Sequence, residues 1–219
     1  MAEAVPVTGQ TPLFSTFPVL PGQKFLCLGD SITEAHPGYV DLLEAAFHAL
    51  YPKHNIEVIN AGISGNRVVD LWKRLHRDVI DRLPDWITIY IGVNDVWHDF
   101  LPNLHGVSLD EYVRVYDQIL TTLQQRLAGA HLLLFTPTCI GERPDTPENQ
   151  RLVNYVAAVH HLGEKHHLPV IDLNAIFWRA IQAGQAANPE YRLTMDGVHP
   201  TLTGHCLIAH TLLRALAAV

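Results

Sequence analysis

Two absences in the 219-residue sequence narrow what the protein can be. Positive charge is scarce, because 15 Lys and Arg stand against 22 Asp and Glu and leave a formal net charge of −7. A nucleic-acid-binding surface needs clustered basic residues to meet phosphates, and the sequence has no such cluster. No uninterrupted apolar run reaches the roughly 18 residues that a membrane span needs. We therefore predict neither nucleic acid nor membrane as a partner.

Cysteine is also sparse. Only Cys27, Cys139 and Cys206 occur, and they lack the C-x-x-C spacing of metal and redox sites. Each lies among apolar residues, so we expect three buried free thiols in a reducing compartment. The N-terminus shows no basic segment followed by a long apolar one. We therefore expect no secretory signal and a cytoplasmic protein, although a chain whose signal had been removed would look the same.

Histidine, in contrast, is abundant, with 14 copies. Four of them, His160, His161, His166 and His167, lie in the stretch VHHLGEKHHLP at the end of a predicted helix. Histidine at a helix C-terminus interacts favourably with the helix dipole and with solvent. We therefore interpret these residues as solvated histidines and expect neither a metal site nor a cofactor.

Short apolar runs alternate with amphipathic stretches from residue 24 onward. Five runs have the length and β-branched content of buried strands, namely 24–28, 56–60, 86–91, 131–136 and 168–173. Stretches with helical periodicity lie between and after them, at 39–50, 68–83, 109–127, 148–166 and 204–219. Repeated strand–helix units predict an α/β protein with a parallel sheet covered by helices on both faces.

The chain length suits one core, so we expect a single domain over residues 24–219. Residues 1–23 contain several prolines and little periodicity. We expect them to form an extended arm on the surface of the domain. If the protein forms a homo-oligomer, this arm is a candidate contact element.

Candidate functional residues follow the predicted strands. In open parallel sheets, ligands bind in the crevice outside the carboxyl ends of the strands. Ser31 follows the first strand in GDSIT, Gly65 follows the second in NAGISGN, and Asn94 follows the third in GVND. The loop MDGVHPT, ahead of the last helix, adds Asp196 and His199. Four separate segments thus bring chemically useful groups to one edge of the sheet.

These residue types are the parts of an acyl-transfer site. A serine hydroxyl is a weak nucleophile that needs a base within hydrogen-bond reach and a group that orients the base. His199 can accept the proton of Ser31, and Asp196 can orient the imidazole and stabilise its protonated form. The negative charge of a tetrahedral intermediate needs N–H donors, and the candidates are the backbone amides of Ser31 and Gly65 and the side-chain amide of Asn94.

Each residue also has an ordinary structural explanation. Ser31 and Asn94 are common turn and helix-cap residues, and Gly65 suits a turn with positive φ. Asp196 and His199 can be plain loop residues. The structural explanation holds well for each position alone, but the complete set after the right strands favours a catalytic site.

The blocks GDSIT, NAGISGN, IGVND and DGVHP resemble the four signature blocks of the SGNH hydrolases, the GDSL-type esterase family. The resemblance runs from about residue 24 to the C-terminus. It implies a flavodoxin-like, three-layer α/β/α sandwich around a five-stranded parallel sheet. It also implies that Ser31, Gly65, Asn94 and His199 hold the family's four signature positions, with Asp196 as the third member of the triad. The first block reads GDSIT in place of GDSL, which leaves the surroundings of the serine unchanged.

The sequence lacks the G-x-S-x-G elbow of the α/β-hydrolases, the other common serine-hydrolase fold. Among the remaining serines, Ser64 is the competing nucleophile to consider, because it precedes Gly65. We interpret Ser64 as a residue that shapes the loop.

Residues 84–100 and 198–216 are similar to bacterial acetyl esterases of that family that act on acetylated sugars, including acetyl-xylooligosaccharides. The implied substrate is a small ester, and such enzymes are often oligomeric. Trp97, three residues after Asn94, can stack on a sugar ring at the rim of the cleft, or it can simply pack beneath the next loop. Tyr39 is a second candidate for the lining of the cleft.

Two rival interpretations remain. One is a broad arylesterase, lysophospholipase or acyl-thioesterase of the same fold, although the chain shows no long apolar lid. The other is a non-catalytic carbohydrate-binding protein, since a fold by itself does not establish an activity. The complete set of Ser31, Asp196 and His199 disfavours the second, because a binding protein does not need all three.

Overall fold

A computed structural model of the chain describes residues 12–218. Its five strands form one parallel sheet in the order β2-β1-β3-β4-β5. The strands are β1 (Lys24–Gly29), β2 (Glu57–Gly62), β3 (Trp86–Tyr90), β4 (His131–Phe135) and β5 (Val170–Ile171). Every residue of β3, the central strand, is buried, because helices cover both faces of the sheet. This confirms the predicted α/β class and the five-stranded parallel sheet.

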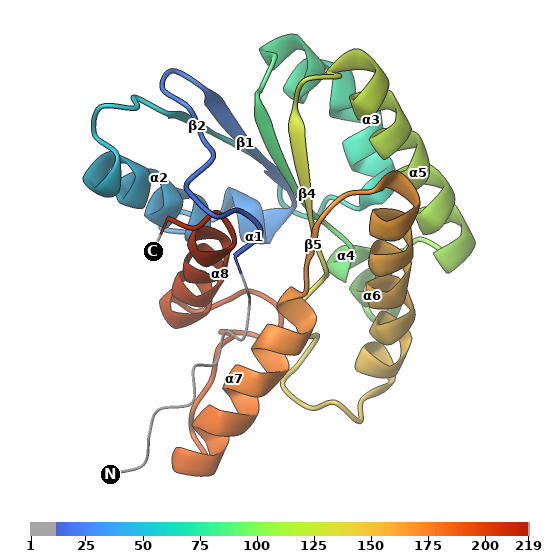
Figure 1. The fold of residues 1–219 in the computed structure, drawn as a ribbon. Helices are drawn as coiled ribbons and strands as arrows, with labels where there is room; N and C mark the ends of the chain where they lie inside the picture. The colour runs from blue at the N-terminus through green and yellow to red at the C-terminus, as the bar shows by residue number, and fades with distance from the viewer. Residues whose placement is uncertain (1–11, 219) are drawn as a thin grey trace.

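The helices are α1 (Ser31–Glu34), α2 (Tyr39–Leu50), α3 (Val68–Asp78), α4 (Val93–Trp97), α5 (Leu109–Arg126), α6 (Pro147–His166), α7 (Leu173–Ala187) and α8 (Leu202–Ala215), with 3-10 turns η1 (Ile80–Arg82) and η2 (His98–Phe100). Helix α2 packs against α8, while α3, α5 and α6 form a second layer beyond the sheet (Figure 1). The architecture is therefore the three-layer sandwich that the family resemblance implied.

The last strand differs from the prediction. Residues 168–173 have strand-like composition, but β5 contains only Val170 and Ile171. Asp172 ends the strand because its Oδ1 accepts a hydrogen bond from the backbone N–H of Ala175 and so caps the N-terminus of α7, a helix that the periodicity did not reveal. Thr136 also donates to this carboxylate, at 3.0 Å.

The predicted helix 68–83 is shorter in the structure. Helix α3 ends at Asp78, and η1 follows it. Leu83 then takes a left-handed conformation with φ of 50°. Leu83 precedes Pro84 and therefore cannot continue a helix, because a residue before proline is disfavoured in the right-handed helical region.

Two expectations about side-chain exposure are wrong. Cys27 and Cys139 are buried free thiols, but Cys206 is exposed. His166 was expected to be solvated, yet its ring lies between Asp117, 2.7 Å from Nε2, and Gln124, 2.9 Å from Nδ1. Tertiary packing of α6 against α5 decides this, and a helix-end pattern does not reveal it.

Residues 12–23 contain no helix or strand and run along the domain. The N–H of Leu13 donates to the carbonyl of Ala215 in α8, and the ring of Phe17 stacks on Tyr51 with a centroid distance of 3.9 Å. Residues 1–11 of the expected arm lie outside the described residues. Among those that are described, no helix combines the length and apolar character that a membrane span requires.

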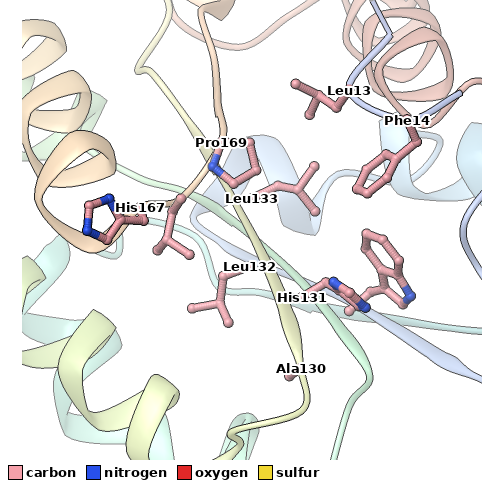
Figure 2. Close-up of a pocket in the computed structure, with 10 residues that line it drawn as sticks. Leu13, Phe14, Ala130, His131, Leu132, Leu133, His167 and Pro169 are labelled. Atoms are coloured by element: carbon pink, nitrogen blue, oxygen red, sulfur yellow. The ribbon is translucent and has the colours of Figure 1, made fainter.

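An apolar hollow of about 380 Å³ lies at the amino ends of the strands (Figure 2). Trp86 and His131, the first residues of β3 and β4, stack in its wall, and Phe14 packs edge-on against Trp86. This end is opposite to the carboxyl edge of the sheet, where Ser31 follows β1. The hollow is therefore not part of the site predicted from the sequence.

Candidate active site

Ser31 is the first residue of α1, directly beyond the carboxyl end of β1. The preceding Asp30 caps this short helix, because its Oδ1 accepts from the N–H of Ile32 at 3.0 Å. The cap makes a sharp strand-to-helix turn and leaves the serine partly exposed at the sheet edge. Ser31 Oγ lies 2.9 Å from Nε2 of His199, although the two residues are 168 positions apart.

The imidazole of His199 is held from its other side by Asp196. Nδ1 of His199 lies 2.6 Å from Oδ2 of Asp196, while Oδ1 of Asp196 accepts from the backbone N–H groups of Val198 and His199. Partial burial raises the pKa of Asp196, but these hydrogen bonds outweigh it, and the pKa lies below its usual range. The structure thus joins the predicted residues Ser31, His199 and Asp196 in one chain of hydrogen bonds.

Glu142 anchors the loop that carries Asp196, and the sequence analysis missed it. Its Oε1 accepts three hydrogen bonds, from the backbone N–H groups of Leu193 and Thr194 and from the Thr194 hydroxyl, at 2.7 to 2.9 Å. Next to it, the N–H of Gly141 donates to the carbonyl of Gly197 at 2.6 Å. Glu142 lies in the loop after β4. Functional residues of a parallel sheet follow the carboxyl ends of its strands, so the position of Glu142 after the fourth strand is the signal that could have found it.

Gly65 comes from the loop after β2, and Asn94 is the second residue of α4, which follows β3. Gly65 has a φ of 73°, which favours glycine. Asn94 is buried, and its Nδ2 donates one hydrogen bond to the carbonyl of Asn66 at 3.0 Å, so its second N–H is available. Within residues 12–218, the backbone N–H groups of Ser31 and Gly65 donate to no other residue. The edge of the sheet therefore has three N–H groups that can serve an incoming oxygen.

A buried arginine on α3 ties these loops together. Arg74 donates from Nη2 to the carbonyl of Gly29 at 2.8 Å, from Nη1 to a carbonyl in β2, and from Nε to Oδ1 of Asn66 at 2.7 Å. Asp78 balances its charge, with 3.0 Å between Nη1 and Oδ2. Since Asn66 also holds the amide of Asn94, Arg74 links β1 and β2 to the loop that positions Asn94. The helical pattern predicted where α3 lies but not this role.

Two carboxyl groups beside the site are fully buried. Burial raises the pKa of Asp30 to about 7, although the N–H of Ile32 stabilises its charged form. Burial raises the pKa of Asp95 to about 8, and the N–H of Val68 opposes this only in part. Oδ2 of Asp95 has no hydrogen-bond partner within the described part of the chain. A neutral Asp95 is therefore the favoured form at neutral pH.

This burial makes the stability difference between Asp95→Asn and wild type depend on pH. The folded-state pKa of about 8 exceeds the unfolded reference of about 3.9, so the contribution of the wild-type carboxyl is full below pH 4 and is lost as pH rises through about 8. Asparagine does not titrate. We expect the free energy of unfolding of the variant, relative to wild type, to improve from pH 5 to about pH 8 and to level off above that pH in urea denaturation. Asp110→Asn, at an exposed helix position, is the matched control, and a pH-independent difference would contradict the assignment.

The two candidate substrate contacts differ. Tyr39 does not line the cleft: it is fully buried, with its hydroxyl 3.0 Å from Thr33 Oγ1, so that expectation is wrong. Trp97 is partly buried against the core, and its ring lies edge-on to His199 with 6.2 Å between centroids. Trp97 thus packs inward and also lies beside the imidazole, and its stacking on a sugar ring stays a prediction.

Ser64 does not take the place of Ser31. Its backbone N–H donates to Oε2 of Glu34 at 2.8 Å, and its hydroxyl makes no hydrogen bond to any described residue. The contact with Glu34 joins the Gly65 loop to α1, which agrees with the interpretation of Ser64 as a residue that shapes the loop.

The sequence profile of the GDSL-like lipase/acylhydrolase family matches residues 27–207. The chain belongs to this family. The match spans all four motifs that carried the resemblance, and it confirms that resemblance. As a GDSL-like acylhydrolase, the protein is a carboxylic ester hydrolase.

Known relatives of this GDSL-like acylhydrolase agree in sequence and in fold. An acetylxylan esterase of Geobacillus stearothermophilus is 33% identical over 213 residues, which are 89% of this chain and 94% of that esterase. The crystal structure of an acetylxylan esterase from the same organism has a TM-score of 0.78 at 32% identity and covers 90% of this chain and 95% of its own. An alpha/beta hydrolase enzyme from the metagenome of Lake Arreo, Spain, has a TM-score of 0.81 at 30% identity, with 91% and 97% covered.

Three further structures of the Geobacillus esterase are of catalytic mutants, in which an aspartate, a histidine or a serine is replaced by alanine. In that esterase, the mutated aspartate and histidine lie three positions apart.

Proposed function

We propose that the protein hydrolyses acetyl esters of sugars or oligosaccharides through a triad of Ser31, His199 and Asp196. The observation that carries the proposal is the continuous hydrogen-bond chain from Oγ of Ser31 to His199, at 2.9 Å, and on to Asp196, at 2.6 Å. The Asp-x-x-His spacing equals that of the residues altered in the catalytic mutants of the Geobacillus esterase, which supports the same roles here.

The reaction begins with attack of Ser31 Oγ on the ester carbonyl carbon. The hydroxyl proton moves to Nε2 of His199, and Asp196 stabilises the imidazolium through Nδ1. The carbonyl oxygen becomes an oxyanion, which accepts hydrogen bonds from the N–H groups of Ser31, Gly65 and Asn94. When the tetrahedral intermediate collapses, the C–O bond to the alcohol breaks and His199 returns the proton to that alcohol, which leaves an acyl-serine.

Water completes the cycle. His199 accepts a proton from water, the resulting hydroxide adds to the acyl carbon, and the same three N–H groups bind the second oxyanion. Collapse breaks the bond between the acyl carbon and Oγ of Ser31, and His199 returns its proton to Oγ. The product leaves as acetic acid, which ionises to acetate in water. Asp196 remains ionised throughout, since its pKa lies below its usual range.

Acetyl specificity rests on similarity to acetylxylan esterases together with the position of Trp97 beside His199. An indole offers a flat apolar face to a sugar ring. We expect activity on 4-nitrophenyl acetate to exceed that on the butyrate, and both to exceed that on the octanoate. We also expect acetate release from acetylated xylooligosaccharides. A preference for acyl chains of eight carbons would contradict this proposal and would favour a lysophospholipase or thioesterase instead.

A further inference from the structure

A cavity of about 350 Å³ with both polar and apolar walls opens beside the Gly65 loop, a volume at the lower end of the range for small-molecule sites. It lies between the start of α3 and the segment around η2. Its walls are formed by Gly65, Arg67, Asp70, His98, Asn103, Leu104 and His105.

The cavity adjoins the proposed triad in two ways. Gly65, whose amide is a candidate oxyanion donor, is part of its wall. Trp97 lies beside one residue of each region, because its ring centroid is 6.2 Å from that of His199 and 6.5 Å from that of His98, a residue of the cavity wall. A substrate that places its ester at Ser31 can therefore extend into this cavity.

One wall is a fixed ion pair. Nε of Arg67 donates to Oδ2 of Asp70 at 3.0 Å, and Nη1 donates to the carbonyl of His105 at 2.8 Å. Partial burial raises the pKa of Asp70, but hydrogen bonds from Lys73 and Arg67 outweigh it, so the carboxylate is ionised at neutral pH. The guanidinium is held in one orientation, and its Nη2 donates to no residue within 12–218.

Another part of the wall holds a nearly buried imidazole. His98 is 9% exposed, and its ring makes no hydrogen bond with any residue the structure describes. Burial and the nearby charge of Arg67 lower the pKa of His98, so the ring is neutral at physiological pH. A neutral imidazole has one N–H donor and one nitrogen acceptor. This matches a hydroxyl group, which also donates and accepts.

We propose that this cavity binds the sugar ring that carries the acetyl group, with His98 and Arg67 forming hydrogen bonds to its hydroxyls. Asn103, whose side chain bonds to no described residue, adds an amide with both donors and an acceptor. A wall that combines donors, acceptors and balanced charge with apolar surface suits a neutral sugar ring, which has both hydroxyls and an apolar face. It suits an acyl chain less well, because the chain would desolvate the polar groups without replacing their hydrogen bonds. This inference rests on the proposed function.

The test compares two acetyl esters in His98→Leu. Acetylated xylobiose can occupy the cavity, whereas 4-nitrophenyl acetate carries no sugar. We expect kcat/KM on acetylated xylobiose to fall about ten-fold more than kcat/KM on 4-nitrophenyl acetate, since an unpaired sugar hydroxyl loses a hydrogen bond. Xylobiose should also inhibit 4-nitrophenyl acetate hydrolysis more weakly than in wild type. His48→Leu, at an exposed position on α2, is the matched control and should change neither quantity.

A second variant covers the case in which His98→Leu does not fold. Asn103 has a φ of 61°, and aspartate tolerates this region as asparagine does, so Asn103→Asp removes the amide donors without straining the backbone. We expect about a three-fold preferential loss on acetylated xylobiose.

Three outcomes would overturn the inference. Equal losses on both esters would mean that these residues only support the fold. A gain on 4-nitrophenyl octanoate in His98→Leu would make the cavity an acyl-chain pocket. If wild type cleaves 4-nitrophenyl acetate but no acetylated sugar, the proposed function fails together with this inference. A wild type that cleaves both esters, with variants that lose both equally, would instead contradict only the role of the cavity.

Discussion

Replacement of Ser31 by alanine is expected to lower kcat at least about 10⁴-fold, because the members of a serine triad act as a unit and no other group can form the acyl-enzyme. Steady-state assays with 4-nitrophenyl acetate measure the loss. The fold should stay intact, since Oγ of Ser31 bonds only to His199 among the described residues. Circular dichroism and thermal unfolding check this.

Ser64→Ala is the matched control for Ser31→Ala. Its hydroxyl makes no hydrogen bond within the described part of the chain, and its contact with Glu34 uses the backbone N–H, which alanine keeps. We expect near wild-type kcat. Retention of more than a few per cent of activity in Ser31→Ala, or loss of activity in Ser64→Ala, would contradict the assignment of Ser31 as the nucleophile.

Asn94→Ala is expected to lower kcat by roughly 100- to 1,000-fold with little change in KM, as typically follows the loss of one oxyanion donor. The Nδ2 group has one hydrogen bonded to Asn66 and one free, so its contact with the substrate strengthens as charge develops on the carbonyl oxygen. The kcat and KM values on 4-nitrophenyl acetate separate this from a binding effect.

Two checks accompany Asn94→Ala. Asn154→Ala removes an exposed asparagine from α6 and should leave kcat unchanged. A rise in KM at constant kcat in Asn94→Ala would contradict an oxyanion role and would indicate ground-state binding instead.

Much of the fold is readable in the order of the residues. Apolar runs such as 86–91 do not alternate polar with apolar residues, so both faces of the strand must be buried. Such a strand requires helices on both faces of the sheet. The amphipathic pattern of residues 109–127 predicts one such helix, and in the structure α5 spans Leu109–Arg126. The chemistry-bearing residues follow the strands, and parallel strands end at one edge, so Ser31, Gly65 and Asn94 were predictable as neighbours.

Other features depend on partners far along the chain. Tyr39 begins an amphipathic helix, and only the packed structure shows its ring to be buried beside Tyr90 and Phe135. Glu142 is an ordinary loop residue until the fold brings it to Thr194. Arg74 carries a charge in a helical pattern, yet its donors satisfy carbonyls that belong to strands.

Residue types and their periodicity alone determined the alternation of strands and helices. They also determined which edge of the sheet holds the candidate acyl-transfer residues. These properties follow from local burial and from the direction of parallel strands. Tertiary structure decided which side chains face one another: the 2.9 Å contact of Ser31 with His199, the burial of Tyr39 and the anchoring by Glu142. The reason is physical, because a hydrogen bond needs two groups aligned to within a few tenths of an ångström, and only packing of the whole domain sets that alignment.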